Sequence, residues 1–133
     1  MINVLAFGVF DGLHPGHESF LKQASELGDR LIVSLAPDKV VADLKGREVN
    51  NKFVQRKSAL EALDYIDSVV EGDYEQDTYS SIMKFQPDVI ALGYDQAELE
   101  KSIRAWLPEN NLQIQIVKLK AHEPKKFKSS LMR

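Results

Sequence analysis

Two histidines near the start of the chain are the residues best suited to chemistry. His14 and His17 are separated by Pro15-Gly16, and they end the run Gly-Val-Phe-Asp-Gly-Leu-His-Pro-Gly-His that begins at Gly8. Imidazole N–H groups donate hydrogen bonds to phosphoryl oxygens, and they do so more strongly when the ring is protonated. Two of them three residues apart therefore predict a site for a strongly anionic ligand, such as a phosphate chain.

The elements around this run must position the histidines. The run follows an apolar segment, 2–7, and leads into an amphipathic segment from His17, which is typical of a strand-to-helix turn. Such a turn exposes backbone N–H groups and the positive end of a helix dipole, and both suit a phosphate. We expect Gly8 and Gly16 to let a ligand approach the backbone. Asp11 is expected to accept N–H bonds within the turn or to help hold a divalent cation.

Metal ligation and a purely structural role are the alternatives for the two histidines. A His-Glu-x-x-His zinc helix needs histidines four residues apart within one helix. His14 and His17 instead straddle Pro15-Gly16, with no third ligand nearby in the sequence. We therefore predict no protein-bound metal site. A structural role in a glycine-rich polar turn stays open at this point.

Composition restricts the class of protein. The 133 residues suit a single domain, 1–133, and the 44% hydrophobic and 28% charged residues argue against a disordered or membrane class. No apolar stretch approaches the ~18 residues needed to span a bilayer, and no signal peptide precedes Ile2. The absence of cysteine excludes disulfides, thiolate catalysis and thiolate zinc sites. We expect a cytoplasmic enzyme or binding domain, with no membrane partner.

The net charge of −3 is unevenly distributed. Residues 118–133 hold six basic side chains and one acidic side chain, so they carry +5 and the rest of the chain carries −8. A basic tail on an acidic body favours a small polyanion or self-association over long nucleic acid. A nucleic-acid site would need a broader basic face with interleaved aromatic residues, so we predict no nucleic-acid partner. A solvated lysine tail is the alternative.

Strand and helix signals alternate along the chain. Short apolar runs predict five strands, and the amphipathic segments between them predict five helices, several of them bounded by proline or glycine. We expect strands at 2–8, 30–36, 68–71, 89–93 and 112–119, and helices at 17–27, 37–44, 54–65, 76–85 and 96–106. The predicted fold is α/β: a Rossmann-like, doubly wound parallel five-stranded sheet, order 3-2-1-4-5, with helices on both faces.

This fold would bring a second loop to the histidine turn. Ligands bind open parallel sheets at the carboxyl ends of the strands, where the strand order reverses. The first and fourth strands are neighbours at that point, and the fourth ends in Leu-Gly-Tyr-Asp-Gln, 92–96. We therefore expect Gly93, Asp95 and Gln96 to line the same crevice as the histidines. As turn-forming residues these three would look the same.

The histidine turn resembles the signature of the cytidylyltransferase-like nucleotidyltransferases, in the pattern Gly8-x-Phe10-Asp11-x-x-His14-x-Gly16-His17. The resemblance extends over nearly the whole chain. The family's other motifs match Lys45-Gly46-Arg47, Arg56 in Gln-Arg-Lys-Ser-Ala-Leu-Glu-Ala-Leu, residues 92–96 and Lys128-Ser129-Ser130. Within the family the chain is most similar to archaeal FAD synthetases, which are FMN adenylyltransferases, and next to glycerol-3-phosphate cytidylyltransferases.

The resemblance implies transfer of a nucleoside monophosphate from a nucleoside triphosphate to an acceptor phosphate, with release of pyrophosphate. The leading reaction is transfer of AMP from ATP to FMN, which gives FAD. The acceptor phosphomonoester is already an anion, so positioning and cationic donors matter more than a base. Mg²⁺ is expected to bind with the triphosphate, and a homodimer is the family's habit.

The resemblance also assigns roles residue by residue. His14 and His17 would bind the phosphate chain and stabilise the transition state, and Lys45 would reach the α-phosphate or the acceptor phosphate. The remaining positions would bind the nucleotide: Gly8, Val9, Phe10, Asp11, Gly16, Arg56, Gly93, Asp95, Gln96, Lys128, Ser129 and Ser130. Lys45 as an exposed lysine and Arg56 as a solvated helix residue are the alternatives.

Two other functions stay open. One is a CTP-dependent cytidylyltransferase acting on glycerol 3-phosphate or a similar small phosphate. It is weakened because such enzymes carry an arginine where this chain has Asp64, before Tyr-Ile-Asp. The other is a non-catalytic nucleotide-binding module. Retention of His14, His17, Lys45 and the two serines argues against it, since binding alone does not require them all.

Overall fold

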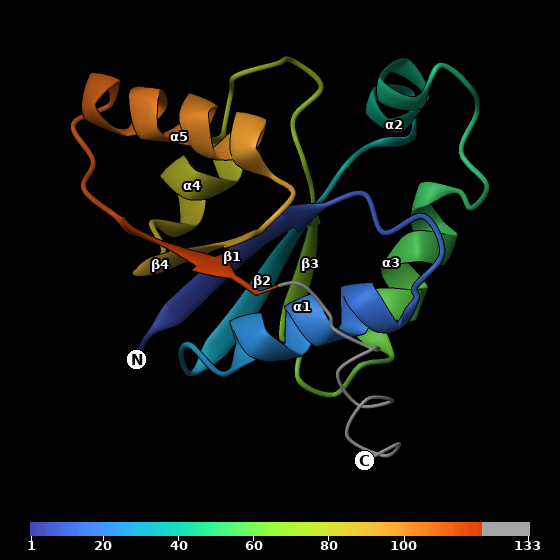
Figure 1. Ribbon diagram of the computed structural model, residues 1–133, viewed down its shortest axis with the longest axis horizontal. Helices are drawn as coiled ribbons and strands as arrows, with labels where there is room; N and C mark the ends of the chain where they lie inside the picture. The colour runs from blue at the N-terminus through green and yellow to red at the C-terminus, as the bar shows by residue number, and fades with distance from the viewer. Residues whose placement is uncertain (121–133) are drawn as a thin grey trace, which may run out of the picture.

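The computed structural model describes residues 1–120 and contains one five-stranded parallel sheet in the order β3-β2-β1-β4-β5 (Figure 1). The strands are β1 (Asn3–Gly8), β2 (Arg30–Leu35), β3 (Ser68–Glu71), β4 (Val89–Gly93) and β5 (Gln115–Leu119). The helices are α1 (Pro15–Ser25), α2 (Asp38–Lys45), α3 (Phe53–Glu61), α4 (Ser80–Phe85) and α5 (Ala97–Glu109). The predicted fold class and strand order are confirmed. Among the described helices, none is long and apolar enough to cross a membrane.

Alternation along the central strands builds two cores, one on each face of the sheet. In β1, Val4 and Ala6 belong to the core beneath α1 and α3, whereas Leu5 belongs to the core beneath α4 and α5. Leu21 of α1 and Ile103 of α5 are both fully buried against their respective faces. Since successive strand side chains point to opposite faces, one apolar run supplies both cores.

Several helix bounds differ from the prediction. For α1 and α4 the reason is a side chain outside the periodic pattern that accepts N–H bonds at the start of the helix. α1 begins at Pro15 rather than His17, because the His14 side chain accepts the first backbone N–H bonds. α4 begins only at Ser80, where Asp73 accepts the Ser80 N–H at 2.8 Å. α5 runs through Pro108 instead of stopping before it. A proline in the last turn removes only one backbone hydrogen bond, and here the helix ends one residue later.

The registers bring the carboxyl ends of β1, β2 and β4 to one edge of the sheet. Gly8 at the end of β1 pairs with Leu35 at the end of β2, while Ala6 pairs with Ala91 near the end of β4. β1 therefore lies at the reversal of strand order, with β2 on one side and β4 on the other. The segments that follow these strands meet at this edge.

Candidate active site

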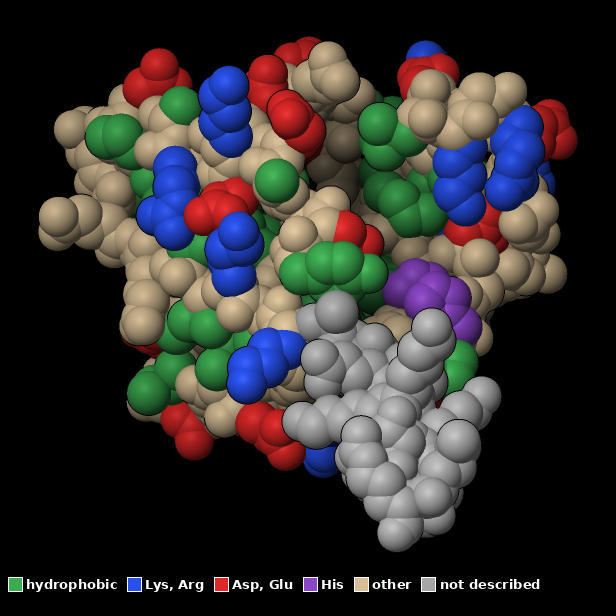
Figure 2. Space-filling view, viewed as in Figure 1, with side chains coloured by type: hydrophobic (Ala, Val, Ile, Leu, Met, Phe, Trp, Pro, Cys, Tyr) green, Lys and Arg blue, Asp and Glu red, His purple; other side chains and the backbone are tan. Residues whose placement is uncertain are grey.

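A cleft of about 740 Å³ opens at the carboxyl ends of β1 and β4. It is lined by residues 7–10 from the end of β1, 14–17 at the start of α1 and 93–96 after β4. Figure 2 shows histidine side chains at the surface beside this part of the molecule. The structure thus brings the histidine turn and the Leu-Gly-Tyr-Asp-Gln loop together, at the point where open parallel sheets bind ligands.

His14 caps α1 with its own ring. Its Nδ1 accepts the Gly16 N–H at 3.1 Å and the His17 N–H at 3.3 Å. The expectation of exposed N–H groups at this turn is therefore wrong for these two amides, because the imidazole occupies them. An Nδ1 that accepts carries no proton, so the neutral His14 ring offers Nε2–H as its donor.

His17 is held between two rings. The His14 ring stacks on it with centroids 3.5 Å apart, and the Phe10 ring meets it edge-on at 5.3 Å. Burial lowers the pKa of His17 below its ordinary value, and the neighbouring His14 and Lys45 lower it further. The Gly12 backbone and Asp95 act in the opposite direction and raise this pKa. Its Nδ1 is buried without a hydrogen-bond partner. In the free site His17 is therefore a neutral imidazole, and an anion bound beside the ring would raise its pKa.

Gly8 makes room for a side chain of the protein rather than for a ligand. A Cβ on Gly8 would lie 2.3 Å from Cε2 and 2.5 Å from Cζ of Phe10. Phe10 has a positive φ of 47° and is 5% exposed, so its ring folds back over the strand end. The expectation that Gly8 admits a ligand to the backbone is corrected: the Phe10 ring fills that space and supports His17.

Gln96 joins the ends of β1 and β4. Its Oε1 accepts the Gly93 N–H at 2.8 Å, and its Nε2 donates to the Phe7 carbonyl at 3.0 Å. The amide predicted to bind the nucleotide is therefore already committed to two strand ends. Asp95 lines the cleft, and Gly93 lets it fold back, since a Cβ there would lie 2.9 Å from Asp95 Oδ1.

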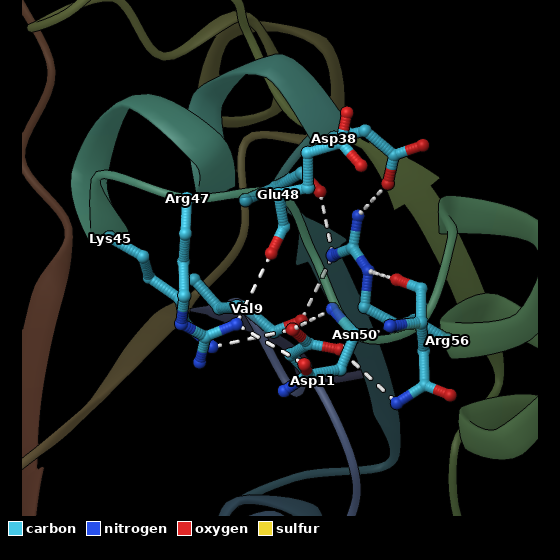
Figure 3. A network of polar contacts seen from close by, with 10 residues as sticks. Val9, Asp11, Asp38, Lys45, Arg47, Glu48, Asn50 and Arg56 are labelled. Atoms are coloured by element: carbon cyan, nitrogen blue, oxygen red, sulfur yellow. Dashed lines mark hydrogen bonds and ion pairs between the residues drawn. The ribbon is translucent and has the colours of Figure 1, made fainter.

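Asp11 organises the loop that follows α2 (Figure 3). Its carboxylate accepts the Asn50 N–H at 2.8 Å, the Asn51 N–H at 2.7 Å and the Asn51 amide at 3.2 Å. Burial alone would raise the pKa of Asp11, but these hydrogen bonds outweigh burial and lower the pKa to about 2. Lys45, the last residue of α2, lies with Nζ 3.4 Å from Asp11 Oδ2 and 31% of its side chain exposed. Asp11 does accept backbone N–H bonds, but from the loop at Asn50 and Asn51 rather than within its own turn, so that part of the expectation is corrected.

Arg56 is enclosed by protein on all sides. Its side chain is 0% exposed, and its Nη2 lies 2.8 Å from Asp38 Oδ1. The remaining donors reach the carbonyls of Val9 at 2.9 Å, Ala36 at 2.8 Å and Asn51 at 3.0 Å. Both readings made from the sequence, a triphosphate ligand and a solvated helix residue, are therefore corrected. Arg56 binds together the ends of β1 and β2 and the loop before α3.

Five lining residues of the cleft lie outside the predicted set, and two of them, Tyr94 and Lys120, bring polar groups to it; the others are Phe7, Pro15 and Phe20. Lys120 follows β5 and lines the cleft, with its backbone held by Gln23 through bonds of 3.1 and 3.4 Å. Tyr94 lines the cleft and is 63% exposed. Lys120 follows the predicted fifth strand, next to β4, and this position could have indicated the cleft. The charge pattern of the sequence instead placed Lys120 in the basic tail at 118–133. Lys128, Ser129 and Ser130 lie outside the described residues.

Metal ligands are sparse in the described part of the chain. No group of three or more His, Asp or Glu side chains there is arranged to hold a metal ion. Both oxygens of Asp11 already accept hydrogen bonds, and Asp95 is the one acidic side chain among the described residues of the cleft. A divalent cation would therefore rest mainly on oxygens of a bound phosphate chain.

A second cavity, of about 400 Å³, adjoins the cleft. It lies between α2, α5 and residues 72–79, and it shares residues 7–9 and Gln96 with the cleft. Figure 2 shows a hollow between the two upper parts of the molecule, with acidic and apolar side chains around it. The end of β1 and Gln96 thus form a common wall between two adjoining chambers.

Comparison with known proteins assigns the chain that contains these two cavities to a family. Residues 5–133 match the family model described as cytidylyltransferase-like. The chain belongs to the cytidylyltransferase-like family. The resemblance predicted from the histidine turn is confirmed, and this cytidylyltransferase-like protein is a nucleotidyltransferase.

Curated relatives of this cytidylyltransferase-like chain are named FAD synthase. It is 39% identical over 122 residues to the FAD synthase of Aciduliprofundum boonei, covering 92% of this chain and 80% of the relative. It is 40% identical over 130 residues to the FAD synthase of Archaeoglobus profundus, covering 98% of this chain and 82% of the relative. A solved structure, titled lipopolysaccharide core biosynthesis protein from Thermoplasma volcanium, matches with a TM-score of 0.83 and 32% identity. That match covers 92% of this chain and 99% of the other.

Proposed function

We propose that this protein is an FMN adenylyltransferase, which transfers AMP from ATP to the phosphate of FMN and releases pyrophosphate. One observation carries the proposal. The stacked imidazoles of His14 and His17 at the start of α1 line a cleft between the loops after β1 and β4, where the strand order of the sheet reverses. The chain also shares about 40% identity with relatives named FAD synthase.

The triphosphate of ATP would lie along the histidines. His14 offers Nε2–H, and His17, which lines the cleft, would offer its own Nε2, since its Nδ1 is buried on the protein side of the ring. Lys45 Nζ lies 3.4 Å from Asp11 Oδ2 beside the histidine turn, and its ammonium would turn from there to an oxygen of the same phosphate chain. Lys120 adds a further cation on the β5 side of the cleft.

The chemistry at this site is a substitution at the α-phosphorus. An oxygen of the FMN phosphate forms a bond to that phosphorus, the bond to the β-phosphate oxygen breaks, and pyrophosphate takes the electron pair. Because the attacking oxygen is already anionic, the residues act by holding the two reactants in line and by donating to charge that builds up on the α-phosphate and pyrophosphate. His14, His17 and Lys45 supply these donors.

The nucleoside of ATP would occupy the β4 side of the cleft. The Asp95 carboxylate is placed to accept hydrogen bonds from ribose hydroxyls. Tyr94 presents an exposed aromatic ring on which a base can stack. Gln96 contributes indirectly, by fixing the strand ends from which both residues project.

The adjoining cavity would receive the body of the acceptor. Its volume of about 400 Å³ falls within the range of small-molecule sites, and its floor includes Phe7, Val40, Leu44, Tyr79 and Leu99. None of its described lining residues is basic. The ring system of FMN would therefore enter the cavity, while its phosphate stays at the common wall, beside the cleft and the α-phosphate.

Three further features are proposals of the same kind. Mg²⁺ would bind with the triphosphate and neutralise its charge when present. The protein would act as a homodimer in the cytoplasm. ATP and FMN would be its small-molecule partners, without nucleic acid or membrane.

Pyrophosphate release tests the proposed reaction. The enzyme is incubated with ATP or CTP, each combined with FMN or glycerol 3-phosphate, and FAD is followed by chromatography. We expect turnover with ATP and FMN alone. Turnover with CTP and glycerol 3-phosphate would replace this assignment with a cytidylyltransferase, and no release in any pair would leave a binding module. His17→Ala should abolish turnover and keep the thermal unfolding transition, whereas Lys57→Ala, on the outer face of α3, should leave turnover unchanged.

A further inference from the structure

A chain of hydroxyl groups ends on a carboxylate at the wall of the second cavity. Ser102 Oγ donates to Asp77 Oδ1 at 2.6 Å, and Tyr79 Oη lies 2.6 Å from Ser102 Oγ. A serine hydroxyl carries one hydrogen, which here goes to Asp77. Tyr79 must therefore donate to Ser102, and the whole chain is polarised from Tyr79 toward the Asp77 carboxylate.

Packing fixes the Tyr79 end of this chain, whereas Asp77 at the other end is exposed. Tyr79 is 8% exposed, and its ring meets Phe7 edge-on at 5.9 Å and Trp106 at 5.4 Å. Burial raises the pKa of Tyr79, so its hydroxyl stays protonated and keeps donating. Asp77 has a positive φ of 58°, a conformation that aspartate adopts more readily than most residues. The hydrogen bond from Ser102 orients this exposed carboxylate on the cavity wall.

The groups left over on this chain are hydrogen-bond acceptors. Tyr79 and Ser102 have used their hydrogens, and an ionised carboxylate only accepts. Three other carboxylates line the cavity: Asp73 is committed to the backbone and hydroxyl of Ser80, and Glu75 and Glu98 take no part in the hydroxyl chain. An occupant of this part of the cavity therefore has to present an N–H or O–H donor, and it cannot be anionic there.

We propose that Asp77, oriented by Ser102 and Tyr79, is a specificity-determining residue that accepts a hydrogen bond from a ring N–H of the acceptor. This inference rests on the proposed function, and in FMN the donor is the imide N–H between the two ring carbonyls. The hydroxyls of Ser34 and Ser81 line the same cavity and supply donors for carbonyl oxygens. The cavity wall therefore combines the Asp77 carboxylate as an acceptor with serine hydroxyls as donors. An imide edge presents the complementary groups, an N–H between two carbonyl oxygens. Glycerol 3-phosphate has no such edge.

The test compares FMN with FMN methylated at the imide nitrogen, in the wild type and in Asp77→Asn, Ser102→Ala and Glu98→Gln. Glu98→Gln is the matched control, because it neutralises a carboxylate of the same cavity outside the hydroxyl chain. The KM for each flavin is measured at saturating ATP, and the Kd of each flavin is measured separately by quenching of flavin fluorescence. A hydrogen bond to a charged group predicts that methylation raises KM and Kd about tenfold or more in the wild type.

Asp77→Asn should weaken binding of FMN and leave the methylated flavin nearly unaffected, so the preference between the two flavins collapses. Ser102→Ala should reduce the preference partly, and Glu98→Gln should keep it. A preference that survives in Asp77→Asn, or is absent from the wild type, overturns the inference even where FAD is formed. If FAD is not formed but the Asp77-dependent preference persists in Kd, the proposed reaction fails and the inference stands. If FMN neither binds nor reacts, both fail.

Discussion

Replacement of Arg56 by methionine separates a structural arginine from a nucleotide ligand. Methionine keeps much of the apolar stem of the side chain and removes the guanidinium. In the structure this removes three hydrogen bonds to the carbonyls of Val9, Ala36 and Asn51, and the ion pair to Asp38. Asp38 is 38% exposed and can turn to water, so the main penalty comes from the carbonyls left without a donor.

The size of the effect follows from this geometry. A buried carbonyl left without a donor costs about 1–3 kcal/mol in the free energy of unfolding, so the three carbonyls, each in the lower part of that range, together cost about 3–5 kcal/mol. A chain of 133 residues has a total of about 7–20 kcal/mol. Arg56→Met should therefore still fold, with a Tm lowered by about 10–20 °C. Arg56→Lys keeps the charge but not the planar fork, so it should recover only part of the loss.

Thermal unfolding followed by circular dichroism, with the KM for ATP measured well below the transition, is the assay. Lys57→Met is the control on the same helix, since its ion pair to Glu61 is exposed and 3.9 Å long. The reasoning would be refuted by an unchanged Tm in Arg56→Met. An unchanged Tm together with a raised KM for ATP would restore Arg56 as a ligand of the triphosphate.

Three further predictions concern the histidine turn. The hydrogen bonds that lower the pKa of Asp11 to about 2 stabilise the fold at pH values above 3.8, the pKa of this carboxyl in the unfolded chain. This stabilisation is lost as the pH falls toward 2. Urea unfolding should show wild type more stable than Asp11→Asn at pH 5 and the gap shrinking by pH 2.5; a constant gap contradicts this origin. The pKa of His17 is lowered in the free protein, and the charge of ATP should raise it, so binding near pH 6 takes up protons. Calorimetry in buffers of different ionisation enthalpy should detect uptake that disappears in His17→Ala; equal uptake in both would exclude His17. Gly8→Ala would drive Cβ into the Phe10 ring, so we expect a loss of about 1–3 kcal/mol in unfolding free energy and a fall in turnover; an unaltered Tm would contradict the packing.

Sequence reasoning worked best where a feature depends on neighbours along the chain. The apolar runs and the proline and glycine boundaries placed all five strands and five helices, with errors of a few residues at most of their ends. Two errors reach four residues, at the end of α3 and at the start of α4, and the second arose because Asp73 caps the helix from seven residues away. The closure of α2 near Gly46 was predicted from glycine, and the structure has Gly46 there with a φ of 69°.

The candidate site was predicted in its location and only partly in its contacts. His14, His17 and Asp95 do line one cleft, because parallel strands bring their carboxyl ends to one edge. Gln96 looked like a ligand residue, yet its amide donates to the Phe7 carbonyl, 89 residues away in the chain. No local pattern announces such a partner, since it depends on which strands become neighbours.

The amino-acid sequence by itself determined the alternation of strands and helices, the histidine turn and hence the family and its kind of chemistry. Local spacing suffices for these features, because periodicity and turn residues act over a few positions. The tertiary structure decided which polar groups remain available to a ligand. Arg56 finds the carbonyls of Val9 and Ala36 across 47 and 20 residues, and Phe10 occupies the space beside Gly8. Packing commits these groups to the protein itself, since a buried donor or acceptor must find a partner wherever the fold places one.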